Sequence, residues 1–435
     1  MEKSKQFDRL ILFETIRNDE FAASLADLTL CAADETGAGK SSSAAYLAAQ
    51  RLLINRIGRG SISGNYLQDY LCSLIADDEN VFARMSEDGV YKDLRPGAME
   101  ERLEDFLSPE AKAVLLLAAS EIALLSDVYR FDWGTFNSDP GENNLASIPV
   151  STKNLSRREL IHEAMTQETP LAAAMKLSGY FHSYGSGVFQ SSPALSAEEI
   201  GLVPIQNIDP ISMDDLVGNE SQKRALKDNI EVLLSGLPAN NMLLYGDSGT
   251  GKSSSVKALL NMYASRGLKM ISVAKNKLDR LPVILDQIAD RGMKFIVFID
   301  DLSFEENEHE YKAFKSIIEG RVAPRPKNTV FIVTTNRKNI VKEIWRDREG
   351  ESDVRRRDNM QEKKSLADRF GITLVFSAPD KKEYLEIVRD IAFKSGLLMP
   401  DDELVAEALK WEIRHGGRSG RIARQFVDYM IGVRR

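Results

Sequence analysis

The chain has 435 residues, a formal net charge of −8 at pH 7 and a sequence pI near 5.4. This length exceeds the size at which a single hydrophobic core stops growing, so we expect two or three domains. The 43% hydrophobic and 28% charged content is typical of a soluble globular protein, and the acidic balance makes nucleic acid an unlikely partner. Two cysteines, Cys31 and Cys72, without any Cys/His spacing for zinc fit a reducing, cytoplasmic compartment.

Residues 1–195 show helical periodicity almost throughout. The clearest helices are expected over residues 44–57 and 109–129, and Thr169 followed by Pro170 has the form of an N-cap with proline in the first turn. The most apolar segment is interrupted by polar residues and is too short to span a bilayer, so we expect no membrane contact. Residues 1–195 are therefore interpreted as a helical N-terminal domain that ends in a Gly- and Ser-rich linker at 184–195.

From residue 211 the pattern changes to an alternation of strands and helices, within a core expected over residues 196–378. Short apolar runs predict five strands, and the helical stretches between most of them imply a parallel sheet covered on both faces. These strands are expected at residues 242–245, 270–273, 295–299, 330–334 and 373–376. Asp380, with Glu383 three residues later, predicts the start of a final helical region. The expected fold is an α/β core over 196–378 and a small helical lid over 379–435.

Residues 246–253 read GDSGTGKS, a complete G-x-x-x-x-G-K-[ST] phosphate-binding loop. An apolar run precedes the loop and helical spacing follows it, which favours this interpretation over a Gly- and Ser-rich surface turn. Lys252 can reach the β- and γ-phosphates, and the Ser253 hydroxyl can complete a Mg²⁺ shell. The residues expected to contact the nucleotide are Gly246, Asp247, Ser248, Gly249, Thr250, Gly251, Lys252, Ser253 and Ser254. The chain is therefore predicted to bind a nucleoside triphosphate.

A second GKS sequence occurs in ETGAGKSS, residues 35–42. The first glycine of a phosphate loop would have to occupy the position of Asp34, and no convincing strand ends there. We interpret this segment as a loop that caps the following helix and predict one nucleotide site.

Polar side chains follow two of the expected strands. Asp300 and Asp301 come directly after the strand at 295–299, where Asp300 can hold Mg²⁺ and Asp301 can orient or deprotonate an attacking water. Asn336 ends the next strand, in TTN, and its neutral amide can hold the water or the γ-phosphate without adding charge. An Asx turn at the strand end is the alternative interpretation of Asn336.

Two arginines are placed where they could neutralise the negative charge of a triphosphate. Arg369 comes just before the last core strand, in LADRFGI, and Arg421 lies at the start of the final helix, in GGRSGRIARQF. For each arginine taken alone, a solvated helix face or a surface ion pair is the alternative.

The order of these motifs, with LVGNE at 216–220 upstream, resembles that of AAA+ ATPases over residues 209–435. More narrowly, FIDDLSFE and SLADRFGITLVF resemble the bacterial AAA+ family catalogued as domain of unknown function 815, and the helical N-terminal half resembles that family as well. The resemblance implies that Val217 and Gly218 line the adenine pocket, that Asn336 is sensor 1, that Arg369 is an arginine finger acting in trans, and that Arg421 is sensor 2.

The resemblance also implies ATP and Mg²⁺ as ligands and a homo-oligomer. The leading hypothesis is an ATPase that couples hydrolysis to remodelling of an unknown protein partner through the N-terminal helical domain. AAA+ proteins usually carry Asp-Glu where this chain has Asp300–Asp301, so Glu305 or Glu306 is an alternative base. The same departure keeps open a nucleotide-gated scaffold or switch with little hydrolysis.

Overall fold

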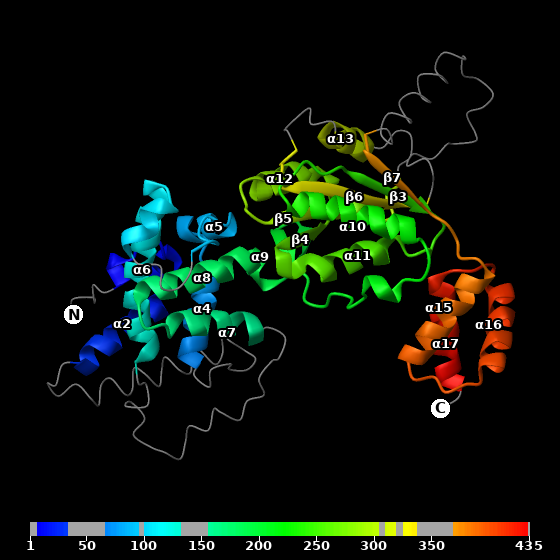
Figure 1. Ribbon diagram of the computed structural model, residues 1–435, viewed down its shortest axis with the longest axis horizontal. Helices are drawn as coiled ribbons and strands as arrows, with labels where there is room; N and C mark the ends of the chain where they lie inside the picture. The colour runs from blue at the N-terminus through cyan, green and yellow to red at the C-terminus, as the bar shows by residue number, and fades with distance from the viewer. Residues whose placement is uncertain are drawn as a thin grey trace, which may run out of the picture. The chain divides into compact units, whose positions relative to one another are not determined.

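The computed structural model describes residues 7–33, 66–94, 100–131, 155–303, 309–318, 325–336 and 369–433 (Figure 1). The chain divides into two compact units: unit 1 comprises residues 1–191 and 291–293, and unit 2 comprises residues 192–290 and 294–435. The second GKS sequence, the helix expected over 44–57, Glu305 and Glu306 all lie outside the described residues. Within the described part of the chain, no helix has both the length and the apolar character needed to cross a membrane.

The described elements of unit 1 are all helical. They are η1 (Phe7–Arg9), α1 (Glu14–Arg17), α2 (Glu20–Ala33), α4 (Tyr66–Asp77), α5 (Val81–Glu87), η2 (Glu100–Asp105), α6 (Pro109–Arg130), α7 (Leu155–Met165), α8 (Pro170–Tyr184) and α9 (Val188–Ser191). The predicted helix over 109–129 is confirmed as α6. The predicted cap is confirmed too: Thr169 is the N-cap of α8, and its hydroxyl accepts a hydrogen bond from the Ala172 N–H. The expected linker at 184–195 contains the boundary between the two units, after Ser191, but it is not a plain linker, since buried Phe189 and Leu195 there belong to α9 and to the first strand.

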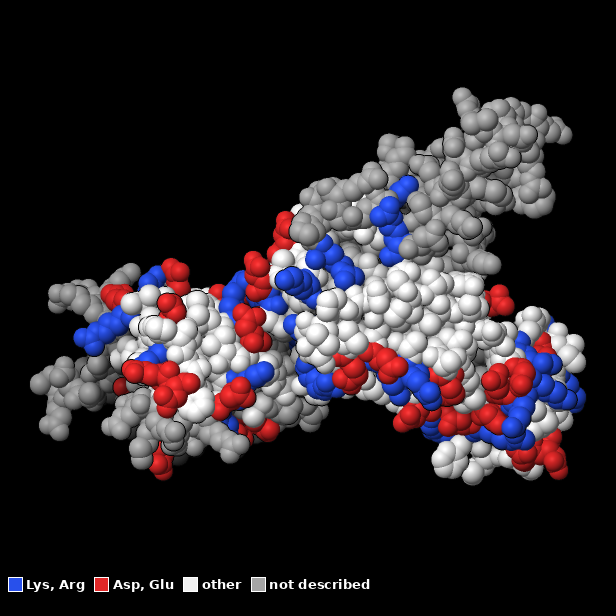
Figure 2. Space-filling model, turned by 45° about the horizontal axis from the view of Figure 1, so that its top comes forward, with Lys and Arg blue, Asp and Glu red and all other residues white. Residues whose placement is uncertain are grey.

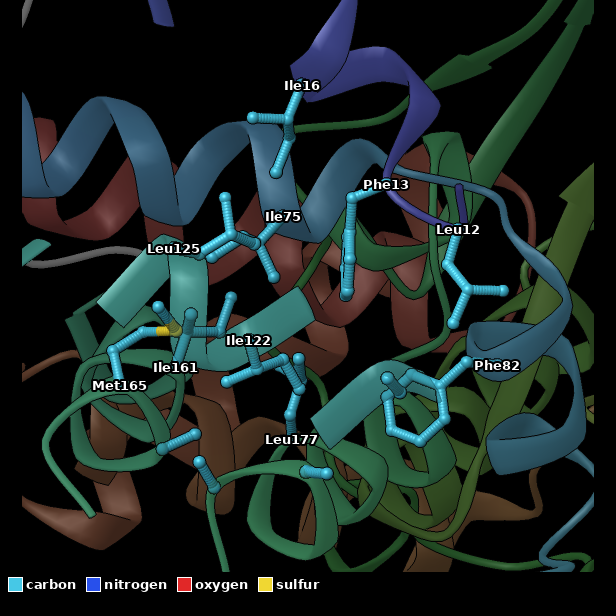
Figure 3. Packing of buried hydrophobic residues seen from close by; sticks show 14 of the residues in the cluster. Leu12, Phe13, Ile16, Ile75, Phe82, Ile122, Leu125, Ile161, Met165 and Leu177 are labelled. Atoms are coloured by element: carbon cyan, nitrogen blue, oxygen red, sulfur yellow. The ribbon is translucent and has the colours of Figure 1, made fainter. Parts of the chain in front are cut away.

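The core of unit 1 is formed by apolar side chains from every described helix of the unit except α9. Figure 3 shows these side chains converging; they include Phe13, Ile16, Ile75, Phe82, Ile122, Leu125, Ile161, Met165 and Leu177. The buried carboxylate of Glu121, in α6, accepts the N–H groups of Ile11, Leu12 and Phe13. Because the N–H groups of Leu12 and Phe13 would otherwise be buried without an acceptor, this side chain has a structural role.

Unit 2 is built on a seven-stranded sheet in the order β2-β1-β4-β5-β6-β3-β7. Its strands are β1 (Ala194–Glu198), β2 (Gly201–Pro204), β3 (Met242–Gly246), β4 (Leu268–Ser272), β5 (Lys294–Ile299), β6 (Thr329–Thr335) and β7 (Ile372–Phe376). All neighbours are parallel except the pair β1 and β2. The five predicted strands are β3 to β7, but the expected strand count is wrong because β1 and β2 extend the sheet. Their sequences, ALSAE and GLVP, are short and carry no continuous apolar run.

Helices cover both faces of this sheet. The helices and 3-10 turns of the core are η6 (Met213–Asp215), α10 (Glu220–Leu234), α11 (Lys252–Tyr263), η7 (Ala264–Arg266), η8 (Lys275–Arg280), α12 (Leu281–Ala289) and α13 (His309–Ile318). Helices α10 and α11 lie side by side (Figure 1) and pack on the face that includes Leu244 and Ile332. Phe314 of α13 contacts Phe331, whose side chain leaves β6 on the opposite face. The result is the three-layer α/β core expected from the sequence.

The lid of unit 2 consists of three helices, α15 (Lys381–Lys394), α16 (Asp401–His415) and α17 (Gly420–Val433). They enclose a small core that includes Tyr384, Ala408 and Phe426. The predicted start of this region is confirmed by a capping box between Asp380 and Glu383.

A buried ion pair holds residues 291–293 within unit 1, although the chain on either side of them belongs to unit 2. The side chains of Arg291 and Glu87 are 1% and 0% exposed, and Arg291 Nη2 donates to Glu87 Oε1 at 2.8 Å. Arg291 Nη1 also donates to Glu79 Oε2 at 2.8 Å, and Ser186 donates its N–H and its hydroxyl to Glu87. Burial raises the pKa of Glu87, while Arg291 and Ser186 act to lower it.

Removing one partner of this pair should destabilise the protein more than replacing both. Arg291→Met leaves the Glu87 carboxylate buried without its cation, so we expect a loss of about 3–5 kcal/mol in the free energy of unfolding. The double variant Arg291→Met/Glu87→Leu should be more stable than the single variant. Because a raised carboxyl pKa means that the native state binds the proton more tightly, the deficit of Arg291→Met should shrink as the pH falls through that pKa.

Denaturant titration followed by circular dichroism measures these differences. Lys112→Met, which breaks the exposed ion pair with Glu104, is the matched control and should leave the midpoint nearly unchanged. If the double variant is no more stable than Arg291→Met, the loss of stability does not come from leaving the Glu87 carboxylate unpaired, and this account of the buried ion pair is wrong.

Candidate nucleotide-binding site

The phosphate loop connects β3 to α11, in the strand–loop–helix order that the motif predicts. Gly246, Gly249 and Gly251 have φ values of +148°, +80° and +95°, which glycine adopts far more readily than other residues. A Cβ on Gly246 would lie 2.0 Å from the carbonyl oxygen of Phe376 in β7. The glycines are therefore required by backbone conformation and by the close approach of a neighbouring strand.

Lys252, the first residue of α11, is 6% exposed and its ammonium group lies at the loop. Its Nζ donates to the carbonyl oxygens of Gly246 and Asp247, both at 2.7 Å, and to Asn336 Oδ1 at 3.0 Å. Burial lowers the pKa of Lys252, and the nearby carboxylates, Asp301 first among them, act in the opposite direction. The lysine is thus held where the motif requires a cation for the phosphates.

The two acids follow β5 and lie next to the loop. Asp300 Oδ1 accepts from the hydroxyls of Ser253 and Thr334, each at 2.5 Å. Asn336 Nδ2, at the end of β6, donates to Asp301 Oδ1 at 2.6 Å. Since parallel strands place their carboxyl ends at one edge of the sheet, residues far apart in the sequence meet here.

The oxygen atoms at this edge fit Mg²⁺. This ion prefers oxygen ligands and is commonly held by one or two carboxylates together with substrate phosphates. Ser253 Oγ and Asp300 Oδ1 already lie within 2.5 Å of each other. The described residues contain no group of three or more His, Cys, Asp or Glu side chains that could hold a metal, so phosphate oxygens and water would complete the shell.

The loop borders a cavity of about 870 Å³, large enough for a nucleotide. Val217 and Gly218, predicted for the adenine pocket, line it, and so does Arg421. Lys394 of α15 also lines the cavity and forms an ion pair with Asp215. Hydrogen bonds from Lys394 and Ser212 lower the pKa of Asp215 to about 2. The cavity thus lies between the core and the lid of unit 2.

Helix α17 touches the phosphate loop directly. The Gly420 N–H, at the start of this helix, donates to the Gly249 carbonyl oxygen at 3.1 Å. A Cβ on Gly249 would lie 2.9 Å from Ser419 Oγ and 3.1 Å from Arg421 Cβ. This contact between loop and lid had no signal in the sequence, because the two glycines meet only after folding.

The structure brings together all the predicted site residues except Arg369. That arginine is exposed at the beginning of the segment that leads into β7, and it is not among the residues that line the cavity. Thr334, in contrast, contacts both acids, and the sequence assigned it no role beyond its place in TTN. The feature that could have identified it is the pairing of β5 with β6, which places Thr334 beside the end of β5.

Comparisons with known proteins place this site in a family. A family model described as "Protein of unknown function (DUF815)" matches residues 190–434. A probable spastin homologue of Brugia malayi is 29% identical over 157 residues; the match covers 31% of this chain and 35% of that protein, so the chain spans about a third of this relative's length.

Two solved structures are similar to parts of the chain. The Thermotoga maritima RuvB Holliday junction branch migration motor has 19% identity and a TM-score of 0.37, over 51% of this chain and 64% of that one. The FIGL-1 AAA domain in complex with ADP has 17% identity and a TM-score of 0.37, over 52% of this chain and 74% of that one.

Lys252→Ala should weaken nucleotide binding. The phosphates would lose a buried cation, and hydrogen bonds to charged groups contribute enough that we expect about a 10- to 100-fold rise in Kd. Titration with a fluorescent ATP analogue measures this, with Lys410→Ala, on the surface of α16, as the control. Unchanged affinity in a folded Lys252→Ala protein would contradict the assignment of the loop.

Proposed function

We propose, from the premise that the chain belongs to the DUF815 family and is an ATP-binding AAA+ P-loop protein, that it is an oligomeric Mg²⁺-dependent ATPase. The observation that carries the proposal is the continuous hydrogen-bonded path from Lys252 through Asn336 to Asp301. It joins the cation that would hold the phosphates to the carboxylate that would act on water.

Each polar group has a role in this proposal. Ser253 and Asp300 would hold Mg²⁺, which when bound neutralises charge on the β- and γ-phosphate oxygens. Asp301 would accept a hydrogen bond or a proton from the attacking water, and Asn336 would fix its orientation. Arg421 would answer phosphate charge from the lid, consistent with its place in the lining of the cavity.

Movement would come from the lid and from the N-terminal helical domain. We retain the division at residues 195 and 378 as a proposal, with 1–195 contacting a protein partner and 379–435 responding to nucleotide. The hydrogen bond from Gly420 to Gly249 supports such a response, because it connects the lid to the loop that would hold the phosphates.

Proteins and nucleic acids are both candidate classes of partner. Acidic and basic side chains are intermixed on the face that Figure 2 shows, and the chain as a whole is acidic. The exclusion of nucleic acid is nevertheless not supported by the comparisons, because RuvB is a Holliday junction branch migration motor. Proteins and nucleic acids that co-purify with an Asp301→Asn variant trapped with ATP would identify the partner.

A second candidate function is a nucleotide-gated scaffold with little hydrolysis. The observation that favours it is the short Asp301 side chain, whose Oδ1 already accepts from the Asn336 amide at 2.6 Å. Single-turnover hydrolysis distinguishes a scaffold from an ATPase.

Asp300 and Asp301 should separate by role. Asp300→Ala should impair both Mg²⁺-dependent nucleotide binding and turnover, because a metal ligand is lost. Asp301→Asn should bind ATP normally and lose about 10²–10⁴-fold in hydrolysis, the usual contribution of a general base. Phosphate release under single-turnover conditions measures both; wild-type turnover in Asp301→Asn would show that the base lies elsewhere.

Arg369 should act on the nucleotide of a neighbouring subunit. Arg369→Ala should keep nucleotide binding and lose turnover, for which an arginine supplied in trans typically contributes about 10³–10⁵-fold. The exposed Arg414 of α16 gives a control, Arg414→Ala, that should retain activity.

Mixing Arg369→Ala with Lys252→Ala should partly restore activity, because one type of interface then pairs an intact loop with an intact arginine. No recovery in demonstrated mixed oligomers would show that Arg369 acts only within its own chain.

A further inference from the structure

The backbone turns at Asp301, directly before Leu302, in a conformation that is unusual for a residue other than glycine. Asp301 has φ +51°, and among the described residues the other non-glycine residue with positive φ is Asn219. A left-handed backbone is strained for a residue with a Cβ, and it persists where surrounding contacts hold it in place. The turn comes directly after the end of β5 at Ile299, so it determines the direction in which Asp301 points.

Thr334 of β6 holds this turn through three hydrogen bonds. The Asp301 N–H donates to Thr334 Oγ1 at 2.8 Å, and Thr334 Oγ1 donates to Asp300 Oδ1 at 2.5 Å. The N–H of Leu302, which is 0% exposed, donates to the Thr334 carbonyl oxygen at 2.8 Å. Thr334 is itself 1% exposed, so water does not compete for these contacts.

The direction of each bond at the hydroxyl is determined by its chemistry. A threonine hydroxyl has one proton to donate, and a backbone N–H can only donate. The proton of Thr334 therefore points to the Asp300 carboxylate, and a lone pair accepts from Asp301. A single side chain thus fixes one acid through its carboxylate and the next through its backbone.

We propose that Thr334 is the positioning residue for both acids of the site. It aims Asp300 Oδ1 at the Ser253 hydroxyl, and it keeps Asp301 in the left-handed conformation in which Oδ1 reaches the Asn336 amide. The position of the Asp301 carboxylate is then set by the backbone, which offsets the shorter reach of aspartate compared with glutamate. This inference rests on the proposed ATPase function and identifies what makes an Asp-Asp pair competent.

Thr334→Val tests the inference because it keeps the shape of the side chain and removes the hydroxyl. Groups that orient metal ligands typically change affinity or activity by 10- to 100-fold, so we expect kcat to fall by about this factor and the Mg²⁺ concentration at half-saturation to rise. Binding of a fluorescent ATP analogue without Mg²⁺ should stay unchanged, because Lys252 and the loop are intact. Thr334→Ser retains the hydroxyl and should restore most of kcat.

Thr329→Val is the matched control. Thr329 lies at the other end of the same strand, is 1% exposed, and donates its hydroxyl to Asn328 Oδ1 at 3.2 Å. The substitution Thr329→Val removes a buried hydroxyl from β6 that does not contact the acids, so the kcat and Mg²⁺ dependence of this variant should match those of the wild type.

The outcomes separate this inference from the proposed function. Wild-type kcat and Mg²⁺ dependence in folded Thr334→Val would overturn the role of Thr334. If the wild-type protein hydrolyses no ATP, the proposed function fails, and the Mg²⁺ titration of nucleotide binding alone decides: a tenfold shift in Thr334→Val supports the inference and no shift overturns it. If Thr334→Val does not fold, Thr334→Ala, which leaves space for water at the Asp301 N–H, replaces it under the same criteria.

Discussion

The candidate site depends on the register of three parallel strands. Ile299 of β5 pairs with Val333 of β6, and Thr335 of β6 pairs with Tyr245 of β3. Because side chains alternate along a strand, a slip by one residue would turn Thr334 to the opposite face of the sheet. The same slip would separate Asn336 from the phosphate loop. Backbone pairing, more than any single side chain, therefore determines where the polar groups meet.

The core strands were predictable from the sequence because their burial is local information. Strand β5 is buried at every position from Phe295 to Ile299 and therefore reads as a continuous apolar run. Strands β1 and β2 are different: β1 mixes buried and half-buried positions, and β2 is half-buried throughout. They become strands through pairing, β2 with β1 and β1 with β4. The inclusion of residues 291–293 in unit 1 likewise depends on a partner, Glu87, that is about 200 residues away.

Within the site, the sequence was informative where a short motif contains the whole geometry. Residues 246–253 fold into the loop through their own glycines, so the motif alone identifies them. The importance of Thr334 could not be found in this way, because it follows from the left-handed backbone of Asp301. Aspartate adopts this conformation more often than most residues do, but its presence alone does not predict the conformation at a given position. Arg369 is predicted to act on the nucleotide of a second chain, and such a role cannot be seen in the contacts within a single chain.

The lid contacts the core of unit 2 through a backbone hydrogen bond and through an ion pair, and these two contacts respond differently to change. The hydrogen bond from Gly420 to Gly249 uses backbone atoms, and a Cβ on Gly249 would lie 2.9 Å from Ser419 Oγ, so Ser419 would have to shift to accommodate it. The contact between Lys394 and Asp215 is an ion pair with partly exposed side chains, so salt and substitution weaken it readily. Only the backbone contact ends on the loop itself. A rearrangement of that loop would therefore alter the start of α17 first, and the ion pair on α15 would act as a separate restraint on the lid.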